Sequence, residues 1–291
     1  MSAQPAAAAG TITIGGELTV NRMGYGAMQL TGPGIWGLPR NLPEAVAVLR
    51  RAVELGVQFI DTADAYGPDI NEDLIAEALA PYPPGLVIAS KAGWKRTGPG
   101  QWIHDASPVH LRQACEGSLR RLRLERIDLF QLHVPDARVS FDASVEALAE
   151  LREQGKIRMV GLSNVTREHV ERARQIVPIV SVQNRYSFAD REWDYVLAYC
   201  EQNGIAFMPW APLDSGNLAY AAAARIAARH QASPYQVAIA WLLKRSPNLL
   251  AIPGTASVKH VEENIAAATL QLSDDEYGEM AGEKKKFTTR K

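Results

Sequence analysis

The stretch VQFIDTADAYGPDINEDLIAEALA, residues 57–80, contains a complete strand, loop and helix. Val57–Asp61 is an apolar run of strand length, and Asn71–Ala80 carries apolar residues at the spacing of one helix face. The strand is almost continuously apolar, which is typical of a parallel strand covered on both faces. The stretch therefore predicts one βα unit of a parallel sheet, with polar side chains in the loop after the strand.

The same pattern of apolar run, loop and helix recurs along the chain. The other predicted strands are Met23–Met28, Leu86–Lys91, Ile127–His133, Ile157–Asn164, Ile179–Gln183, Ile205–Trp210 and Leu249–Pro253. The other predicted helices are Pro43–Leu55, Pro108–Leu122, Ala143–Gln154, Arg167–Ile176, Asp190–Asn203, Pro234–Lys244 and Val258–Ala267. Eight units in roughly 270 residues favour a (β/α)8 TIM barrel, whose typical length is about 250 residues. An open doubly wound sheet is the alternative.

The ends of the chain add elements outside the repeated pattern. Thr11–Ile14 and Glu17–Val20 flank Gly15-Gly16, which predicts an N-terminal β-hairpin. Residues 1–10 are expected to form a loose tail, and Ser273–Lys284 a last helix. Because no Pro/Gly/Ser-rich linker or charge run divides the chain, residues 11–291 are expected to form a single domain.

Composition excludes several classes of protein. The 291 residues are 47% hydrophobic, enough apolar material to argue against disorder. Their 31 basic and 32 acidic side chains leave a net charge of −1, which argues against nucleic acid or a membrane surface as partner. Cys115 and Cys200 are the only cysteines and form no motif, which fits a reduced compartment. With no signal-peptide pattern, we expect a cytoplasmic protein, a monomer or weak homo-oligomer.

Polar residues stand where the predicted strands end. In a parallel barrel these ends point to one face, where barrel active sites lie. We therefore predict that polar side chains from successive strands converge in a ring on this face. The ring includes three ionisable residues and two amides. Its members are Asp61, Lys91, His133, Ser163, Asn164, Gln183 and Trp210.

The ring permits proton donation to a carbonyl oxygen. Tyr66 follows Asp61 by five residues, so its loop can fold back over the strand ends. Its hydroxyl needs a pKa below the usual value of about 10, and a nearby ammonium such as Lys91 would lower that pKa. Asp61 can neutralise a buried Lys91, and His133 can hydrogen-bond a substrate oxygen.

The sequence resembles the aldo-keto reductase family over almost its whole length. The matching pieces are FIDTADAYG, IASKAG, QLHVPD, GLSN, VQNRYS, PWAPL and IPGTASVKHVEEN. The resemblance implies a (β/α)8 barrel with a hairpin over its bottom, and NADPH-dependent reduction of aldehydes or ketones. It also implies that Asp61, Tyr66, Lys91 and His133 form the catalytic tetrad, with Tyr66 as general acid and His133 orienting the carbonyl.

The resemblance also assigns the cofactor site. Ser163, Asn164 and Gln183 match residues that hold the nicotinamide carboxamide, and Trp210 matches a ring that stacks on it. The pyrophosphate would lie beside Ala211, Pro212, Leu213 and Ser215, and the adenosine end beside Thr255, His260, Glu263 and Asn264. The remaining cofactor contacts are expected at Gly26, Ala27, Met28, Asp61, Pro253, Gly254 and Lys259.

One departure from the family pattern concerns the 2′-phosphate of NADPH. Gly254 and His260 stand where the family commonly has Lys and Arg. Lys259 and the Thr255 hydroxyl can compensate, so NADPH is the expected cofactor and NADH the alternative.

The substrate is expected to be a small carbonyl compound. The stretch NRMGYGAMQLTGPGIWGLPR, residues 21–40, looks most like family members that reduce pyridoxal. The substrate pocket is expected to be lined by Met28, Trp36, Tyr66, Trp94, Trp102 and His133, although the Trp residues could equally pack loops. No metal is expected, because His104, His110, His169 and His230 show no ligand spacing.

Two other classes of function remain open. A barrel lyase or aldolase could use Lys91 as a Schiff base. A non-catalytic NADP-binding regulatory subunit would share the fold, because function lies in sites and not in folds.

Overall fold

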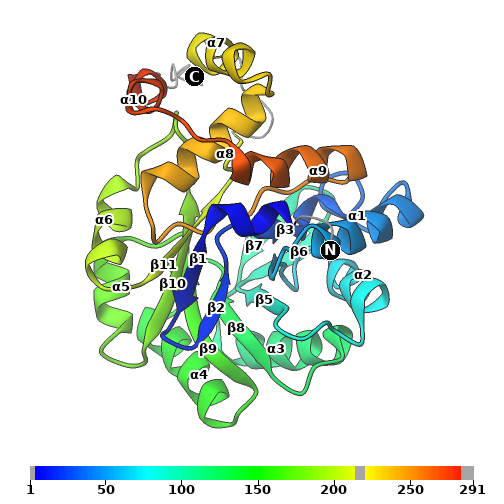
Figure 1. The fold of residues 1–291 in the computed structure, drawn as a ribbon. Coiled ribbons are helices and arrows are strands. Elements are labelled where there is room, and N and C mark those ends of the chain that lie inside the picture. Colours follow the sequence, from blue (N-terminus) through cyan, green and yellow to red (C-terminus); the bar gives the residue numbers. More distant parts are fainter. Residues whose placement is uncertain (1–3, 214–219, 283–291) are drawn as a thin grey trace.

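The computed structural model describes residues 4–213 and 220–282. Its centre is a curled sheet of seven parallel strands, in the order β11-β10-β9-β8-β5-β4-β3 (Figure 1). The strands are β3 (Tyr25–Gly26), β4 (Phe59–Asp61), β5 (Val87–Ala92), β8 (Ile127–Leu132), β9 (Ile157–Ser163), β10 (Ile179–Arg185) and β11 (Ala206–Trp210). Each matches a predicted strand, although β3 is shorter and gives way to the 3-10 helix η2 (Ala27–Gln29).

The eighth predicted strand, Leu249–Pro253, closes the sheet into a barrel. It forms isolated parallel bridges and not a ladder: Leu249 pairs with Phe207, and Ala251 with Met23. Main-chain hydrogen bonds serve both neighbours, from Leu250 N to Phe207 O at 2.9 Å and from Gly24 N to Ala251 O at 2.8 Å. The (β/α)8 barrel is therefore confirmed, and the open doubly wound sheet is not the arrangement.

Helices cover the outside of the barrel. Those of the predicted βα units are α1 (Leu42–Glu54), α2 (Ile70–Leu79), α3 (Pro108–Leu122), α4 (Phe141–Glu153), α5 (Arg167–Ala173), α6 (Asp194–Gln202), α8 (Pro234–Arg245) and α9 (Val258–Ala266). Pro stands in the first turn of α1, α3 and α8, where its missing N–H costs nothing. None of the described helices is both long and apolar enough to cross a membrane.

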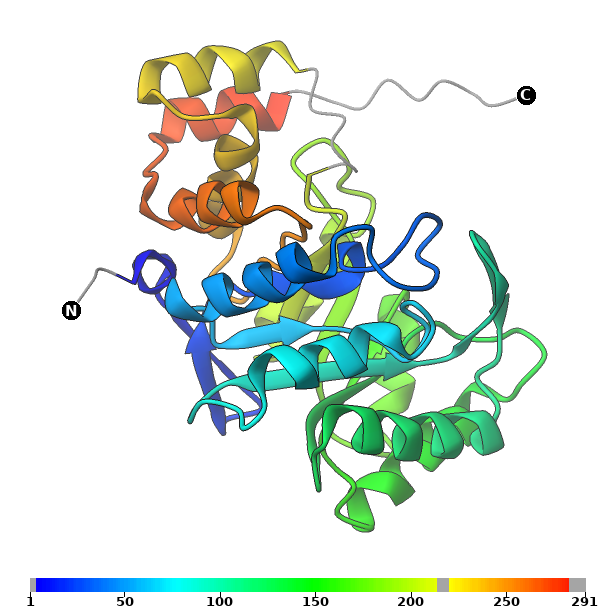
Figure 2. The same ribbon diagram turned by 90° about the vertical axis from the view of Figure 1, so that its right-hand side faces the viewer.

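Two more helices lie together beyond α8, away from the strands (Figures 1 and 2). They are α7 (Ala221–His230), which the sequence analysis did not predict, and α10 (Asp274–Gly282). An ion pair joins Arg225 to Glu279 at 2.6 Å, and His230 Nε2 lies 3.0 Å from Glu276 Oε1. The last helix was expected over Ser273–Lys284, and Lys284 lies outside the described residues.

The predicted N-terminal hairpin plugs the bottom of the barrel. Its strands β1 (Thr11–Ile14) and β2 (Leu18–Asn21) pair antiparallel around Gly15-Gly16. Ile14, Leu18 and Val20 pack into one apolar cluster with barrel residues such as Phe59, Leu129 and Met208. Gly15 has φ +60°, and a Cβ there would lie 2.8 Å from a methyl of Val180. The turn therefore needs glycine for both its conformation and its close approach to β10.

The loose tail expected for residues 1–10 is wrong from Pro5 to Ala9. These residues form the 3-10 helix η1, in which Ala6 and Ala9 are buried. Ala6 N donates to Leu55 O at 3.1 Å, and the small Ala side chains allow this close packing beside the end of α1. Residues 1–3 lie outside the described part of the chain.

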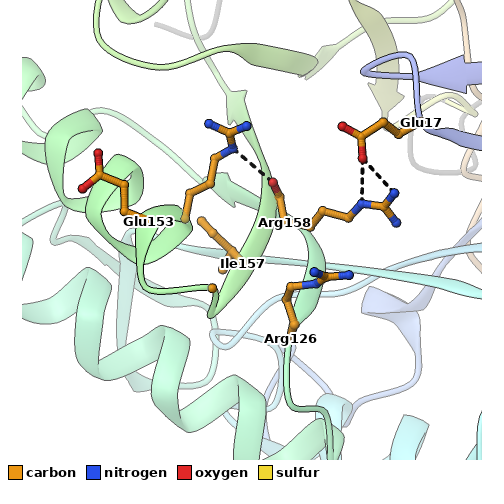
Figure 3. A pocket seen from close by; sticks show the side chains of 7 residues that line it. Glu17, Arg126, Glu153, Ile157 and Arg158 are labelled. Atoms are coloured by element: carbon orange, nitrogen blue, oxygen red, sulfur yellow. Dashed lines mark hydrogen bonds and ion pairs between the residues drawn. The ribbon is translucent and has the colours of Figure 1, made fainter.

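A hollow of about 450 Å³ lies at the bottom of the barrel, where β8 and β9 begin (Figure 3). It is lined by Glu17, Arg126, Arg152, Glu153, Gly155, Ile157 and Arg158. Arg158 Nη2 binds Glu17 Oε2 at 2.8 Å and so ties the hairpin to β9. Because the hollow opens at the starts of the strands, it is separate from the polar ring at their ends.

Candidate active site

Three of the predicted catalytic residues meet at the ends of β4, β5 and β8. Lys91 Nζ donates to both oxygens of Asp61 at 2.8 Å and to the carbonyl oxygen of Thr62 at 2.7 Å. Lys91 is fully buried and Asp61 is 4% exposed. The three N–H bonds of the ammonium group are therefore all used within the barrel, as a buried charge requires.

Tyr66 lies over this ion pair, in the loop after β4. Lys91 Nζ is 5.1 Å from the centre of the Tyr66 ring. The His133 ring meets Tyr66 edge-on, with ring centres 5.8 Å apart. The structure thus brings together the four side chains that the sequence predicted as a catalytic group.

The electrostatics of the group differ from the sequence expectation at Tyr66. Burial raises the pKa of Tyr66 well above its ordinary value, and the negative charges of Asp61 and Asp64 raise it further. Lys91 was expected to lower this pKa, but burial and the charges of Asp61 and Asp64 outweigh that effect. Tyr66 therefore keeps its proton at neutral pH and can donate it.

The other two titrating groups shift in the opposite sense. Burial, and then the charge of Lys91, lower the pKa of His133 well below its usual range, so this ring is neutral at pH 7. Burial also lowers the pKa of Lys91, against the attraction of Asp61. The site at neutral pH therefore holds a neutral acid and a neutral imidazole over an ion pair.

A line of buried amides continues from Asp61 into the barrel. Gln183 Nε2 donates to Asp61 Oδ1 at 2.8 Å and to Gln131 Oε1 at 3.3 Å. Gln131 Nε2 in turn donates to Ser181 Oγ at 2.9 Å. Gln131 and Ser181 lie within strands, so their positions do not carry the strand-end signal. Each stands two residues before a predicted site residue, on the same face of its strand.

The predicted nicotinamide residues on β9 and β11 are joined to His133. Asn164, with φ +56°, donates from Nδ2 to His133 O at 2.9 Å and to Ser163 Oγ at 3.1 Å. Its Oδ1 accepts from Trp210 Nε1 at 3.0 Å. Trp210 is half-buried, and the guanidinium carbon of Arg185 lies 5.4 Å from the centre of its ring. Ala211, Pro212 and Leu213 follow it, and Ser215 lies outside the described residues.

The residues predicted for the adenosine end form a second group. Tyr25 Oη donates to Thr255 O at 2.6 Å, and Gly26 N to Pro253 O at 3.4 Å. These bonds place Gly26, Ala27 and the half-buried Met28 beside residues 253–255. On α9, Lys259 and His260 are exposed, Asn264 is buried, and Lys259 pairs with Glu263 at 3.8 Å.

A hairpin that the sequence analysis did not predict rises beside His133. It consists of β6 (Trp94–Gly98) and β7 (Gln101–His104). Trp94 lies edge-on to His133, with ring centres 6.3 Å apart, and 5.6 Å from Trp102. Trp36 approaches the same group through Arg96, which stacks on Trp102. The predicted Trp residues therefore form one wall, called here the aromatic wall (Trp36, Trp94 and Trp102).

A second buried pair lies beside Tyr66 and was also missed. Asp64 Oδ1 and His110 Nε2 are buried and have no hydrogen-bond partner within the described ranges. The two side chains are 3.9 Å apart at their nearest atoms. Burial, and then the charge of Glu72, raise the pKa of Asp64 well above its usual range. No group of three or more His, Cys, Asp or Glu side chains in residues 4–213 and 220–282 is arranged to hold a metal ion.

Comparison with known proteins places the chain in a family. The aldo/keto reductase family profile matches residues 22–283, so the chain belongs to the aldo/keto reductase family of oxidoreductases. An uncharacterized oxidoreductase of Schizosaccharomyces pombe is 46% identical over 286 residues, which are 98% of this chain and 93% of that protein. Pyridoxine 4-dehydrogenase of Escherichia coli is 45% identical over 272 residues, which are 91% of this chain and 95% of the enzyme.

Solved structures support the same assignment. Glycerol dehydrogenase from Gluconobacter oxydans superposes with a TM-score of 0.85 at 26% identity, covering 94% of each chain. An aldo-keto reductase from Klebsiella pneumoniae in complex with NADPH superposes with a TM-score of 0.79 at 27% identity, covering 93% of each chain.

Proposed function

We propose that this protein reduces an aldehyde or ketone to an alcohol with NADPH, and that Tyr66 is the general acid. The observation that carries the proposal is the arrangement of Tyr66 and His133 over the buried Asp61–Lys91 pair at the ends of the strands. The barrel places this group on the face where the active sites of such folds lie. The related Klebsiella pneumoniae protein was solved with NADPH.

The residues present fit a nicotinamide cofactor. Gln183 uses its NH₂ group within the protein, which leaves its carbonyl oxygen to accept from the amide of a nicotinamide. Trp210 is half-buried and offers an aromatic ring for stacking, and the exposed side chains of Lys259 and His260 offer N–H donors to a phosphate. When bound, the reduced nicotinamide supplies the hydride for the carbonyl carbon.

The chain's own residues supply the proton and the orientation of the substrate. Tyr66, whose raised pKa keeps it protonated, donates its proton to the carbonyl oxygen. His133 is neutral and donates a hydrogen bond to the same oxygen, which fixes the carbonyl against Tyr66. Lys91 stabilises negative charge that develops on Tyr66, and Asp61 holds Lys91 in place.

The substrate that we propose is a flat aromatic aldehyde, with pyridoxal as the first candidate. The aromatic wall begins at His133 and offers ring faces to a planar substrate. The Escherichia coli relative bears the name pyridoxine 4-dehydrogenase, and pyridoxine is the alcohol that forms when the aldehyde pyridoxal is reduced.

The two other classes fit the site less well. A Schiff-base lysine must present a free amine to its substrate. Lys91 is fully buried and gives all three N–H bonds to Asp61 and Thr62. A regulatory subunit would bind NADPH without turnover, so turnover decides between the reductase and this class.

Absorbance of NADPH in the presence of pyridoxal and other carbonyl compounds tests the proposal, and NADH gives the cofactor preference. Tyr66→Phe is expected to lower kcat about 10²- to 10⁴-fold, because the proton donor is lost. Its affinity for NADPH, measured by calorimetry, should stay within about twofold of the wild type, because the hydroxyl contributes to chemistry and not to binding. Turnover by Tyr66→Phe at the wild-type rate would refute Tyr66 as the acid.

A further inference from the structure

Arg96, on β6, hydrogen-bonds to several loop segments beside the candidate active site. Its guanidinium group donates to five carbonyl oxygens of the main chain: from Nε to Gln101 at 2.9 Å, from Nη1 to Ile35 at 2.7 Å and Ala65 at 2.9 Å, and from Nη2 to Gly34 at 2.8 Å and Gly98 at 3.5 Å. All five N–H bonds of the side chain are therefore engaged.

These bonds join three segments that are far apart in the sequence. One is the loop of residues 34–36, one is the loop that carries Tyr66, and one is the β6–β7 hairpin. The first and third also touch directly: Gly100 N donates to Gly34 O at 2.9 Å, and a Cβ on Gly34 would lie 2.8 Å from Gly100 N. Trp36 forms a parallel bridge with Gly67, next to Tyr66. The Arg96 side chain contacts all three segments.

The same guanidinium group also fixes two rings of the aromatic wall. Its Cζ atom lies 3.7 Å from the ring centre of Trp102 and 5.7 Å from that of Trp36. A planar, delocalised cation can stack on rings while it donates in its own plane, which an ammonium group cannot do. Arg96 therefore contacts two of the three rings of the wall, Trp36 and Trp102, through one group.

The hydrogen bonds from Arg96 to the three segments are called here the clamp. The bond to Ala65 connects the clamp to Tyr66, the proposed proton donor. Ala65 immediately precedes Tyr66, so a shift of its carbonyl group moves the Tyr66 backbone. A general acid must lie within hydrogen-bond reach of the oxygen that it protonates. A displacement of about 1 Å from a change remote from the reacting atoms can cost roughly 100-fold in rate.

We propose that Arg96 is a positioning residue that sets Tyr66 for proton donation and fixes Trp36 and Trp102 for a flat aromatic substrate. The inference rests on the proposed function for its catalytic part. Two effects of Arg96 can then be measured separately. Through Ala65 it affects kcat for every carbonyl substrate. Through the aromatic wall it affects KM for aromatic substrates alone.

The test compares Arg96→Met and Arg96→Lys with the wild type, with pyridoxal and propanal as substrates. Arg50→Met is the matched control, because Arg50 also donates to a main-chain carbonyl, Ala78 O at 3.1 Å, but on α1. Arg96→Met is expected to lower kcat for propanal about tenfold and kcat/KM for pyridoxal about 100-fold or more, given the cost of misplacement. Arg96→Lys should fall between, because it keeps the charge but not the planar fork.

Calorimetry should show NADPH affinity within about twofold of the wild type in both Arg96 variants, because Arg96 acts on the acid and the wall. Unchanged kinetics for both substrates would overturn the inference. An equal loss in Arg50→Met, or a loss of NADPH affinity as large as the loss of kcat, would also overturn it by showing general destabilisation. If Arg96→Met does not fold, Arg96→Lys carries the same comparison.

Amide hydrogen exchange tests the clamp without turnover. Arg96→Met should accelerate exchange in residues 34–37 and 65–67 and leave the barrel strands unchanged, because only the segments of the clamp lose their bonds. Unchanged exchange in these segments would refute the clamp. If the wild-type protein turns over no carbonyl compound but the exchange result holds, the proposed function fails while the structural role of Arg96 stands.

Discussion

Asp61→Asn probes the buried ion pair on which the site is built. Asp61 is 4% exposed and Lys91 fully buried, and their atoms are 2.8 Å apart. At an effective dielectric constant of about 20, two unit charges at this separation attract by roughly 6 kcal/mol. Removing the carboxylate charge also removes its own desolvation cost, which offsets part of this attraction. The net loss in the free energy of unfolding is expected to be about 3–5 kcal/mol at pH 7, the range for a buried charge left alone.

The loss should depend on pH in a defined direction. Burial lowers the pKa of Lys91, and the charge of Asp61 raises it. Because Asp61→Asn removes that charge, the pKa of Lys91 is lower in the folded variant than in the folded wild type. Between that pKa and the unfolded value of about 10.4, the unfolded state binds more protons, so the stability of the variant rises with pH. The gap between wild type and variant should therefore be largest below the folded pKa of Lys91 and shrink as pH rises toward about 10.

Urea unfolding followed by circular dichroism at pH 7 and pH 9 measures both effects. The matched control is the double variant Asp61→Asn with Lys91→Met, which removes the stranded ammonium and should recover part of the lost stability. A loss below about 1 kcal/mol at pH 7, or a gap that widens at pH 9, would refute the buried-pair argument.

Three further predictions concern other parts of the molecule. Glu17→Ala should lower the free energy of unfolding by less than about 1 kcal/mol, because its ion pair with Arg158 is exposed; a larger loss in urea unfolding would show that the hairpin depends on this pair. The lowered pKa of His133 predicts that kcat/KM does not fall through His133 between pH 8 and pH 6, and a sigmoidal loss centred near about 6.5 that disappears in His133→Gln would contradict it. Gln131→Leu should cost about 1–3 kcal/mol, because Ser181 and Gln183 each lose a buried partner; an unchanged urea midpoint would count against the amide line.

The parts of the site that the sequence predicted share one physical signal. Asp61, Lys91 and His133 are polar residues at the ends of apolar strands, and parallel strands bring their ends to one face. That signal can be read from the order of residues along the chain alone. The barrel could be predicted in the same way, because strands that are buried on both faces appear in the sequence as continuous apolar runs.

The parts that it missed depend on three-dimensional surroundings. The β6–β7 hairpin mixes Lys95, Arg96 and Trp102 without the pattern of a buried strand, and the turn Gly98-Pro99-Gly100 was its one local signal. Helix α7 is rich in Ala and offers few large apolar residues to mark a face. The direction of the Tyr66 pKa shift could not be predicted either, because it depends on how deeply the hydroxyl is buried and on the nearby charges of Asp61 and Asp64.

The way in which the barrel closes bears on its synthesis on the ribosome. The last neighbour of β3 and β11 is the segment around Ala251, and Arg22 beside β3 donates to the carbonyls of Leu243 at 2.6 Å and Leu249 at 3.1 Å. Until those residues leave the exit tunnel, both edge strands of the nascent sheet lack a partner. Unpaired edges of this kind are templates for pairing with another chain, so the nascent sheet is open to association at both edges between the synthesis of β11 and that of residues 249–253.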